Sequence, residues 1–340
     1  MPRKALKSLM QTGKFYNDKY PHRGWKMIDG IKISYEILNF NSWKKMVNIE
    51  FGVTVLDTGQ IKEKMRTFIN STQSTIIHTG PFETYSLMVK EVQRRQIGFK
   101  ETSNFYLTIS GSLHKNHFSG QNYLPFTWTQ MQKEICHLEK CLHLKCADAK
   151  LLNLEVGINI VFPVPVFKFL EESLVSYKGK PFNRYNMDRK GVCLGYYCEL
   201  TQYTVKIYDK GKQFKLPENL MRFELKFIKM QRLKDSGVIT LADLKIKNRV
   251  NKLLRLLLNA WDNVLLYDAT INLKNAALKD EEANLLSTGN NPRFWQQLQK
   301  INKRAFNYQR QKFKKLVAQH GSNIHFVIKN LIQAAWTEGF

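Results

Sequence analysis

No apolar stretch of the 340-residue sequence approaches the ~20 residues that a membrane-spanning helix needs. The opening residues, MPRKALKSLMQTGKFY, contain no apolar segment of signal-peptide length. The five cysteines are an odd number without a disulfide pattern, which is typical of a reducing compartment. We therefore expect a cytoplasmic protein rather than a membrane protein or a disulfide-stabilised secreted one.

Acidic residues are scarce relative to basic ones. The chain has 28 Asp and Glu against 53 Lys and Arg, a net charge of +25 that is spread over its whole length. With 43% hydrophobic residues the chain can still bury a substantial core, so it is not a disordered basic tail. A folded protein of this charge is suited to bind a polyanion, and nucleic acid is favoured over a membrane surface.

The sequence also lacks a convincing zinc motif. Three cysteines and two histidines lie between residues 136 and 146, but the surrounding segment Met131–Lys145 has apolar residues at helical spacing. Because five residues turn a helix by about 140°, the three thiols would point in different directions. A structural helix is favoured here over a metal site.

The pattern of elements changes once along the chain. Short aromatic and β-branched runs typical of strands fill the part from about Lys26 to Met230, with helical interruptions at Thr129–Lys145 and near Phe167–Ser176. After Met230, apolar residues recur at helical spacing. We predict an α+β fold: an antiparallel-sheet body followed by a helical C-terminal part. The expected regions are a basic N-terminal segment 1–25, a strand-rich body 26–235 and a helical region 236–340.

A weak internal similarity runs through the strand-rich body. Asn48–Val55 and Asn153–Ile160 share the pattern N-apolar-E-apolar-G-apolar-x-apolar, and a Pro-Phe pair precedes both Tyr85 and Tyr185 by the same spacing. On this alignment NFYLTIS corresponds to QYTVKIY. Two interpretations stay open: chance in a strand-rich chain, or a duplication that would give similar sheet units at 26–125 and 126–235.

The segment Thr201–Met230 places polar groups in strand-like surroundings. Tyr208 and Glu224 each lie in a run that alternates apolar and polar residues, which predicts two strands with one buried face. The intervening GKQFKLPEN predicts a hairpin loop, with Gly211 and Pro217 as its turn residues. A tyrosine, lysines and a glutamate in such a setting are suited to phosphodiester chemistry.

The ordered motifs NLEVGINI, KIYDKGKQ and LMRFELKF, followed by KDSG, resemble the gene II/gene X type of phage and plasmid replication initiators. The segments SGSLHKNHFSGQN and TGNNPRFWQQL look like parts of related proteins from Bacteroidetes plasmids and phages. The similarity covers roughly residues 45 to 315. It implies a metal-dependent, site-specific single-strand DNA nickase and joinase that starts rolling-circle replication through a covalent 5′-phosphotyrosyl intermediate.

The resemblance assigns roles to individual residues. Tyr208 takes the position of the nicking tyrosine, and Lys210 would neutralise the phosphate or lower the tyrosine pKa from the same strand face. Glu155 and Glu224 match acidic positions that would hold Mg²⁺ or Mn²⁺, and His114 is a candidate third ligand. No His-hydrophobe-His pair occurs, so the site would rely on carboxylates. His114 and His117 would face opposite sides of a strand.

The implied partners are origin DNA, as a single strand or hairpin, together with a host helicase and polymerase in the bacterial cytoplasm. The oligomeric state does not follow from the sequence. Basic residues interleaved with aromatic ones predict phosphate contacts, with Phe306 and Phe313 stacking on bases. The candidate DNA-binding residues are Lys115, Lys206, Lys212, Arg222, Arg304, Arg310 and Lys314.

Other interpretations remain for the same residues. The rival nucleophiles are Tyr203, Tyr308, Tyr196 and Tyr197. The alternative is that the candidate tyrosines are packing residues, as most tyrosines in strands are. The glutamates can instead pair with neighbouring cations, as Glu224 could with Arg222 on the same strand face.

Three other classes of protein are alternatives to a nickase. A non-catalytic, sequence-specific replication or regulatory protein would have the same charge, and an RNA-binding module ranks behind it. A tyrosine recombinase is disfavoured because the sequence has no His-x-x-Arg and its candidate tyrosine lies in a predicted strand.

Overall fold

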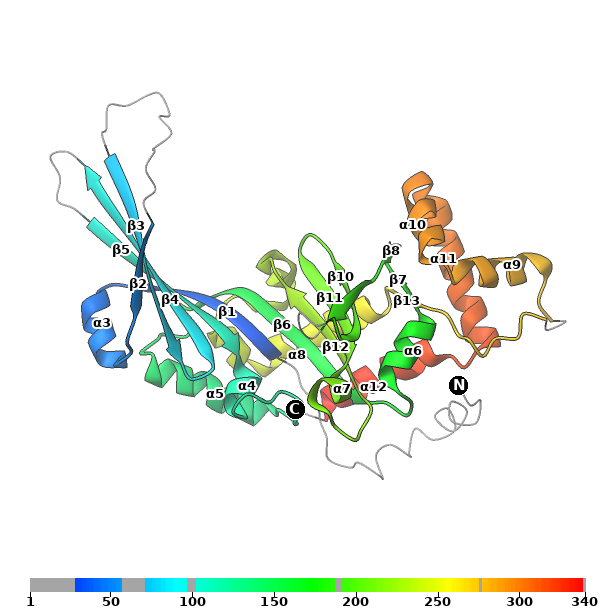
Figure 1. Cartoon of the computed structure of the whole chain (residues 1–340), viewed down its shortest axis with the longest axis horizontal. Helices are drawn as coiled ribbons and strands as arrows, with labels where there is room; N and C mark the ends of the chain where they lie inside the picture. Colours follow the sequence, from blue (N-terminus) through cyan, green and yellow to red (C-terminus); the bar gives the residue numbers. More distant parts are fainter. Residues whose placement is uncertain (1–27, 57–70, 97–101, 187–190, 275–276, 339–340) are drawn as a thin grey trace.

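The computed structural model describes residues 28–56, 71–96, 102–186, 191–274 and 277–338 (Figure 1). The expected basic segment 1–25 lies outside these residues. Within the described part, ten strands form one large antiparallel sheet, three short strands form a second sheet, and helices dominate after residue 230. The predicted α+β class, with a helical C-terminal part, is confirmed.

The strands of the large sheet are β1 (Ile28–Ile37), β2 (Gly52–Leu56), β3 (Ser71–Phe82), β4 (Tyr85–Gln96), β5 (Thr102–Ser112), β6 (Lys150–Val161), β9 (Asn183–Asn186), β10 (Cys193–Glu199), β11 (Tyr203–Asp209) and β12 (Leu220–Phe227). The small sheet consists of β7 (Leu174–Tyr177), β8 (Lys180–Pro181) and β13 (Val264–Leu266). The helices are α3 (Phe40–Val47), α4 (Leu113–His117), α5 (Trp128–Cys141), α6 (Val166–Ser173), α7 (Lys210–Phe214), α8 (Lys247–Trp261), α9 (Asp280–Gly289), α10 (Pro292–Ile301), α11 (Lys303–His320) and α12 (Ile324–Thr337).

The strand order of the large sheet repeats itself about its centre. The order is β2-β3-β4-β5-β1-β6-β12-β11-β10-β9, with β1 and β6 paired in the middle. Counting outward from that pair, one half runs β1, β5, β4, β3, β2 and the other runs β6, β12, β11, β10, β9. In each half the strand that comes first in the sequence lies at the centre, the last one lies next to it, and the others follow in reverse sequence order. Two similar sheet units therefore lie side by side, as one of the two interpretations of the sequence required.

The residue-by-residue alignment proposed for the repeat is wrong. Asn48–Val55 runs from the end of α3 into the edge strand β2, whereas Asn153–Ile160 lies in the central strand β6. NFYLTIS belongs to β5, next to the central pair, while QYTVKIY belongs to β11, one strand further out. Short alternating motifs recur in any strand-rich chain, so they did not mark the equivalent strands.

Alternation along the strands separates a core face from a polar face. On β12, Phe223 is fully buried and packs on Trp261 of α8, with ring centroids 5.2 Å apart. Its neighbours Arg222 and Glu224 point to the opposite face, because successive side chains of a strand alternate. Helices α8 and α12 thus cover one face of the sheet, and the polar residues of β6, β11 and β12 gather on the other.

The expected helical segments are present with slightly different ends. Thr129–Lys145 contains α5, which buries Met131, Ile135 and Leu138, and Phe167–Ser176 overlaps α6. The short helices α3, α4 and α7 were not predicted. Helix α4 is the reason that His114 and His117 do not take the opposite faces expected of a strand: both rings contact Phe126.

The helical C-terminal region divides between two cores. Helices α8 and α12 pack on the large sheet and belong to the main core. Helices α9, α10 and α11 surround a second core that includes Trp295, Phe306 and Phe313. In Figure 1 these three helices stand at the end of the molecule opposite β3–β5.

Candidate active site

A cavity of about 450 Å³ opens on the polar face at the centre of the large sheet. Side chains from β1, β6, β11 and β12 form its floor, and Tyr185 of β9 and Lys210 of α7 form part of its wall. Because β1 belongs to the first sheet unit and the other strands to the second, both units are needed to build it.

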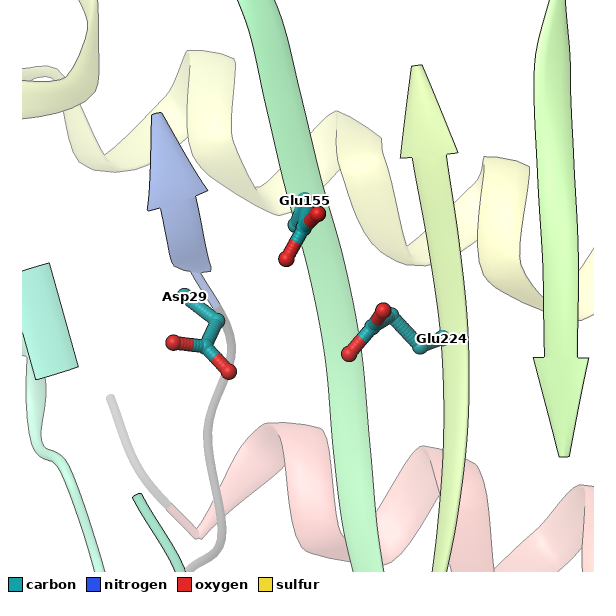
Figure 2. Close-up of side chains that lie close together, drawn as sticks. All are labelled: Asp29, Glu155 and Glu224. Atoms are coloured by element: carbon teal, nitrogen blue, oxygen red, sulfur yellow. The ribbon is translucent and has the colours of Figure 1, made fainter. Parts of the chain in front are cut away.

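Three carboxylates meet on the floor of this cavity. Asp29, Glu155 and Glu224 each place an oxygen within 4.8 Å of the others (Figure 2). Figure 2 shows them on adjacent strands β1, β6 and β12, with the helices passing behind the sheet. Glu155 and Glu224 were predicted from the sequence. Asp29 was missed, because Glu155 and Glu224 were assigned through the family resemblance, which begins at about residue 45.

Gly30 makes room for this cluster. A Cβ atom at position 30 would lie 2.6 Å from Oε2 of Glu155. A side chain at position 30 would therefore displace the flexible end of Glu155 from its present place beside Asp29.

Arg222 lies beneath the cluster and is fully buried. Its Nε donates to Oε2 of Glu224 at 2.7 Å, its Nη2 to Oδ2 of Asp29 at 3.0 Å, and its Nη1 to Oδ1 of Asn159 at 3.0 Å. Gly157 leaves space for the guanidinium, since a Cβ there would meet Nη2 at 3.0 Å. Burial is the largest single effect on both carboxylates and opposes their ionisation. The attraction of Arg222, together with Lys210 for Asp29 and Lys206 for Glu224, outweighs burial, so the pKa values of both lie below their ordinary values. The predicted DNA contact of Arg222 is wrong: the residue is inaccessible and holds the carboxylates.

Two lysines neutralise the accessible sides of the glutamates. Lys206 donates to Oε1 of Glu224 at 3.0 Å, and Lys226 forms an ion pair with Oε1 of Glu155 at 2.7 Å. Burial would lower the pKa of Lys206, but Glu224 raises it above its ordinary value. The ion pairs weighed as an alternative for both glutamates therefore exist. They compensate the charge of the cluster, in which both oxygens of Glu224 and of Asp29 accept hydrogen bonds and Lys226 pairs with one oxygen of Glu155.

Tyr208 lies on β11, directly opposite Arg222 of β12, and lines the cavity. Its ring packs against the ring of Tyr185, with centroids 5.0 Å apart. Gly195 on the neighbouring strand leaves room for Tyr208, because a Cβ at position 195 would lie 2.6 Å from Cβ of Tyr208. No hydrogen bond joins its hydroxyl to another residue in the described part of the chain. Burial, reinforced by the charge of Glu224, raises the pKa of Tyr208 well above that of an ordinary phenol.

Lys210 reaches the cavity from α7 rather than from the strand. The strand ends at Asp209, whose side chain accepts a hydrogen bond from the Lys212 backbone and caps the helix. The Lys210 ammonium donates to Oδ1 of Asn122 at 2.6 Å, and Asn122 donates to Oδ2 of Asp29 at 2.6 Å. Burial, with Arg222 nearby, lowers the pKa of Lys210 to about 7. The predicted hairpin loop thus contains a short helix that orients this lysine.

The structure does not bring His114 into the carboxylate cluster. The imidazole is buried in α4 and stacks on Phe126 with ring centroids 4.8 Å apart. Burial lowers its pKa to about 3. Asp29 takes the third place that the sequence interpretation had given to His114.

The remaining candidate DNA-binding residues lie in three places. Lys115 and Lys206 line the cavity, while Lys212 is exposed beside it and lies over the ring of Phe167. Arg304 is exposed on α11, far in the sequence from the residues that line the cavity. Arg310 and Lys314 turn inward from α11 to Asn263 and to the carbonyl of Asp262.

The rival tyrosines do not share the cavity. Tyr203 lies on the core face and bonds to Tyr177 through its hydroxyl at 2.9 Å. Tyr308 is 65% exposed on α11. Tyr196 and Tyr197 lie on β10, outside the residues that line the cavity. Among the tyrosines that the sequence offered, the structure brings Tyr208 to the acidic cluster.

No family model matches the sequence, and no curated protein does. The described helices include none that is both long and apolar enough to cross a bilayer. The fold is similar to the structure of a rolling-circle replication initiator protein from Geobacillus stearothermophilus, with 10% identity and a TM-score of 0.34 over 77% of this chain and 95% of that one. This similarity is too remote to carry an argument about function, which rests on the geometry of the site.

Proposed function

We propose that this protein is a metal-dependent, site-specific single-strand DNA nickase and joinase that starts rolling-circle replication of a phage or plasmid. The observation that carries the proposal is a tyrosine in the wall of a cavity whose floor holds three converging carboxylates. The net charge of +25 favours a polyanionic substrate. We propose that the cavity of about 450 Å³ takes one nucleotide unit of a single strand.

The residues on the floor fit a hard divalent cation. Asp29, Glu155 and Glu224 supply carboxylate oxygens, which Mg²⁺ and Mn²⁺ prefer, within 4.8 Å of one another, so small side-chain shifts would let one ion contact all three. Bound there, such an ion would draw negative charge from the scissile phosphate. Lys206 and Lys226 would give up part of their contact with the glutamates, since they now occupy one oxygen of each.

Tyr208 is the proposed nucleophile. Its oxygen would form a bond to phosphorus while the bond from phosphorus to the 3′ oxygen breaks, and that oxygen would leave with a proton as a free 3′ hydroxyl. The 5′ phosphate stays on the tyrosine, so the bond energy is retained for later rejoining. The 3′ hydroxyl is a primer for a host polymerase in the bacterial cytoplasm, with a host helicase opening the duplex.

The raised pKa of Tyr208 identifies what activation requires. Burial and the negative charge of Glu224 both disfavour the phenolate. Neutralising Glu224 removes the second of these effects. Lys210, whose pKa is about 7, is neutral in a large fraction of molecules at physiological pH and would accept the phenol proton, or in its charged form would stabilise the phosphate.

The test is adduct formation on supercoiled DNA of the replicon that encodes this protein, with Mg²⁺ or Mn²⁺. We expect nicked circles that carry the protein on the 5′ end, with mass spectrometry locating the DNA at Tyr208. Tyr208→Phe should form no adduct, and the matched control Tyr308→Phe should form it normally. An adduct at Tyr308, or none in the wild type, would contradict the proposal; the second outcome with tight binding would favour a non-catalytic DNA-binding protein.

A further inference from the structure

The helices α10 and α11 carry charge of one sign only. Between residues 292 and 320 the sequence has eight Lys and Arg and no Asp or Glu. The basic residues are Arg293, Lys300, Lys303, Arg304, Arg310, Lys312, Lys314 and Lys315. The sequence predicts that these basic residues contact phosphates while Phe306 and Phe313 stack on bases.

The packing of α11 contradicts that expectation. Phe306 is 3% exposed and Phe313 is fully buried, both in the second core against Trp295. A Cβ at Gly289 would lie 2.3 Å from the Phe313 ring, which shows how closely α9 covers it. The two rings hold the helices together and are unavailable for stacking on bases.

The opposite side of α11 presents a continuous exposed stripe. Arg304, Tyr308, Gln311 and Lys315 are all exposed and lie at i, i+4, i+7 and i+11, which places them on one face of a helix. Arg304 and Lys315 have no ion-pair or hydrogen-bond partner elsewhere in the residues that the structure describes. Their cations are therefore available for another molecule.

We infer that this stripe is a docking surface for duplex DNA, separate from the cavity that takes the single strand. The stripe runs over the twelve residues from Arg304 to Lys315, a length of about 16 Å, which equals about five base pairs of groove. An α-helix fits the major groove of B-form DNA, with cations reaching the phosphates and the Gln311 amide and Tyr308 hydroxyl facing the groove. Figure 1 places α11 at the end of the molecule away from β3–β5, projecting from the body as such docking requires.

The neighbouring residues explain why α11 keeps this face free. Arg310 and Lys314 point inward to Asn263 and Asp262, and Lys312 pairs with Glu281 at 3.7 Å. These contacts fix the helix against the small sheet and α9. The inference rests on the proposed function only in taking DNA as the substrate.

The experiment measures binding in a Tyr208→Phe background, so that no strand is cut. The probes are a mixed-sequence 24-base-pair DNA duplex, a 24-nucleotide single strand and an RNA duplex of the same sequence. The test variant is Arg304→Glu with Lys315→Glu. The matched control is Lys252→Glu with Arg255→Glu, which makes the same charge change on an exposed part of α8. Thermal melting checks that both variants are folded.

We expect the test variant to lose about 10- to 100-fold in affinity for duplex DNA, and the slope of log affinity against log salt to fall by about 2. The control should lose less than about 3-fold, and the wild-type stripe should bind duplex RNA more weakly because a helix does not enter the A-form major groove. Equal losses in test and control variants, or equal affinity for both duplexes, would overturn the inference. If the wild type forms no tyrosyl adduct while these binding results hold, the proposed function fails and the docking surface stands.

Discussion

Replacing Arg222 by methionine tests the central charge balance of the site. The side chain is fully buried and bonds to Glu224 at 2.7 Å and to Asp29 at 3.0 Å. With charge centres about 4 Å apart and an effective dielectric constant of about 20, each attraction is worth about 4 kcal/mol. Methionine also removes the desolvation cost of the guanidinium, so we expect a net loss of about 3–5 kcal/mol in the free energy of unfolding at pH 7.

The pH dependence of stability should change sign in the same variant. In the wild type the pKa values of Asp29 and Glu224 are depressed, so their contribution is present above about pH 4 and is lost as the pH falls through the folded pKa values. Without Arg222, burial would raise both pKa values above those of the unfolded chain. The folded variant would then bind more protons than the unfolded chain, and its stability should rise as the pH falls from 7 to 5.

Urea denaturation at several pH values between 4 and 8 measures both effects. Arg255→Met, at an exposed position on α8, is the control and should cost less than about 0.5 kcal/mol. A loss below about 1 kcal/mol for Arg222→Met, or an unchanged sign of the slope, would refute the reasoning that Arg222 neutralises the two buried carboxylates.

Three further predictions follow from single contacts. Gly30→Ala places a Cβ 2.6 Å from the flexible end of Glu155, so we expect a small stability cost of about 1 kcal/mol. Nicking assays should show at least a 10-fold weaker apparent affinity for Mn²⁺, because the Glu155 carboxylate is displaced. Unchanged metal dependence would contradict the proposal that Glu155 holds the metal. Glu224→Gln should lower the rate of nicking about 100-fold or more without abolishing DNA binding, with both measured on the same oligonucleotide. Near-normal cleavage would exclude this carboxylate from the reaction. The pKa of Lys210 is lowered to about 7, so between pH 7 and 10 the unfolded chain binds more protons than the folded one, and wild-type stability should rise with pH. Lys210→Met should flatten this rise in urea titrations. An equally steep rise in the variant would show that Lys210 is not the group responsible.

The sequence predicted the elements of the second sheet unit well because its strands alternate strictly. In β12, apolar residues at every second position identify the core face, and Arg222 and Glu224 follow on the other face. The same alternation placed Tyr208 beside them. Neighbouring strands joined by a short connection usually pair, which was sufficient to bring the tyrosine and the glutamate together.

Contacts between distant segments were beyond local patterns. Asp29 is 126 residues from Glu155, and nothing near Asp29 shows that β1 pairs with β6. Lys210 was placed on a strand because its helix has only five residues, too short for a periodic signal. His114 was chosen as a ligand for its chemistry, but burial against Phe126 decided its role, and burial follows from tertiary packing.

The repeated strand order of the large sheet explains the position of the site. Within the large sheet the two units pair at β1 and β6, and the acidic cluster straddles that junction, with Asp29 from one unit and Glu155 and Glu224 from the other. Arg222 bonds across the same junction, since it joins Asp29 to Glu224. Separating the units would therefore leave a buried arginine and a glutamate without Asp29, and would remove one ligand from the proposed metal site. The pairing that completes the sheet is the same one that completes the site, so the proposed catalysis and the joining of the two units depend on the same contacts.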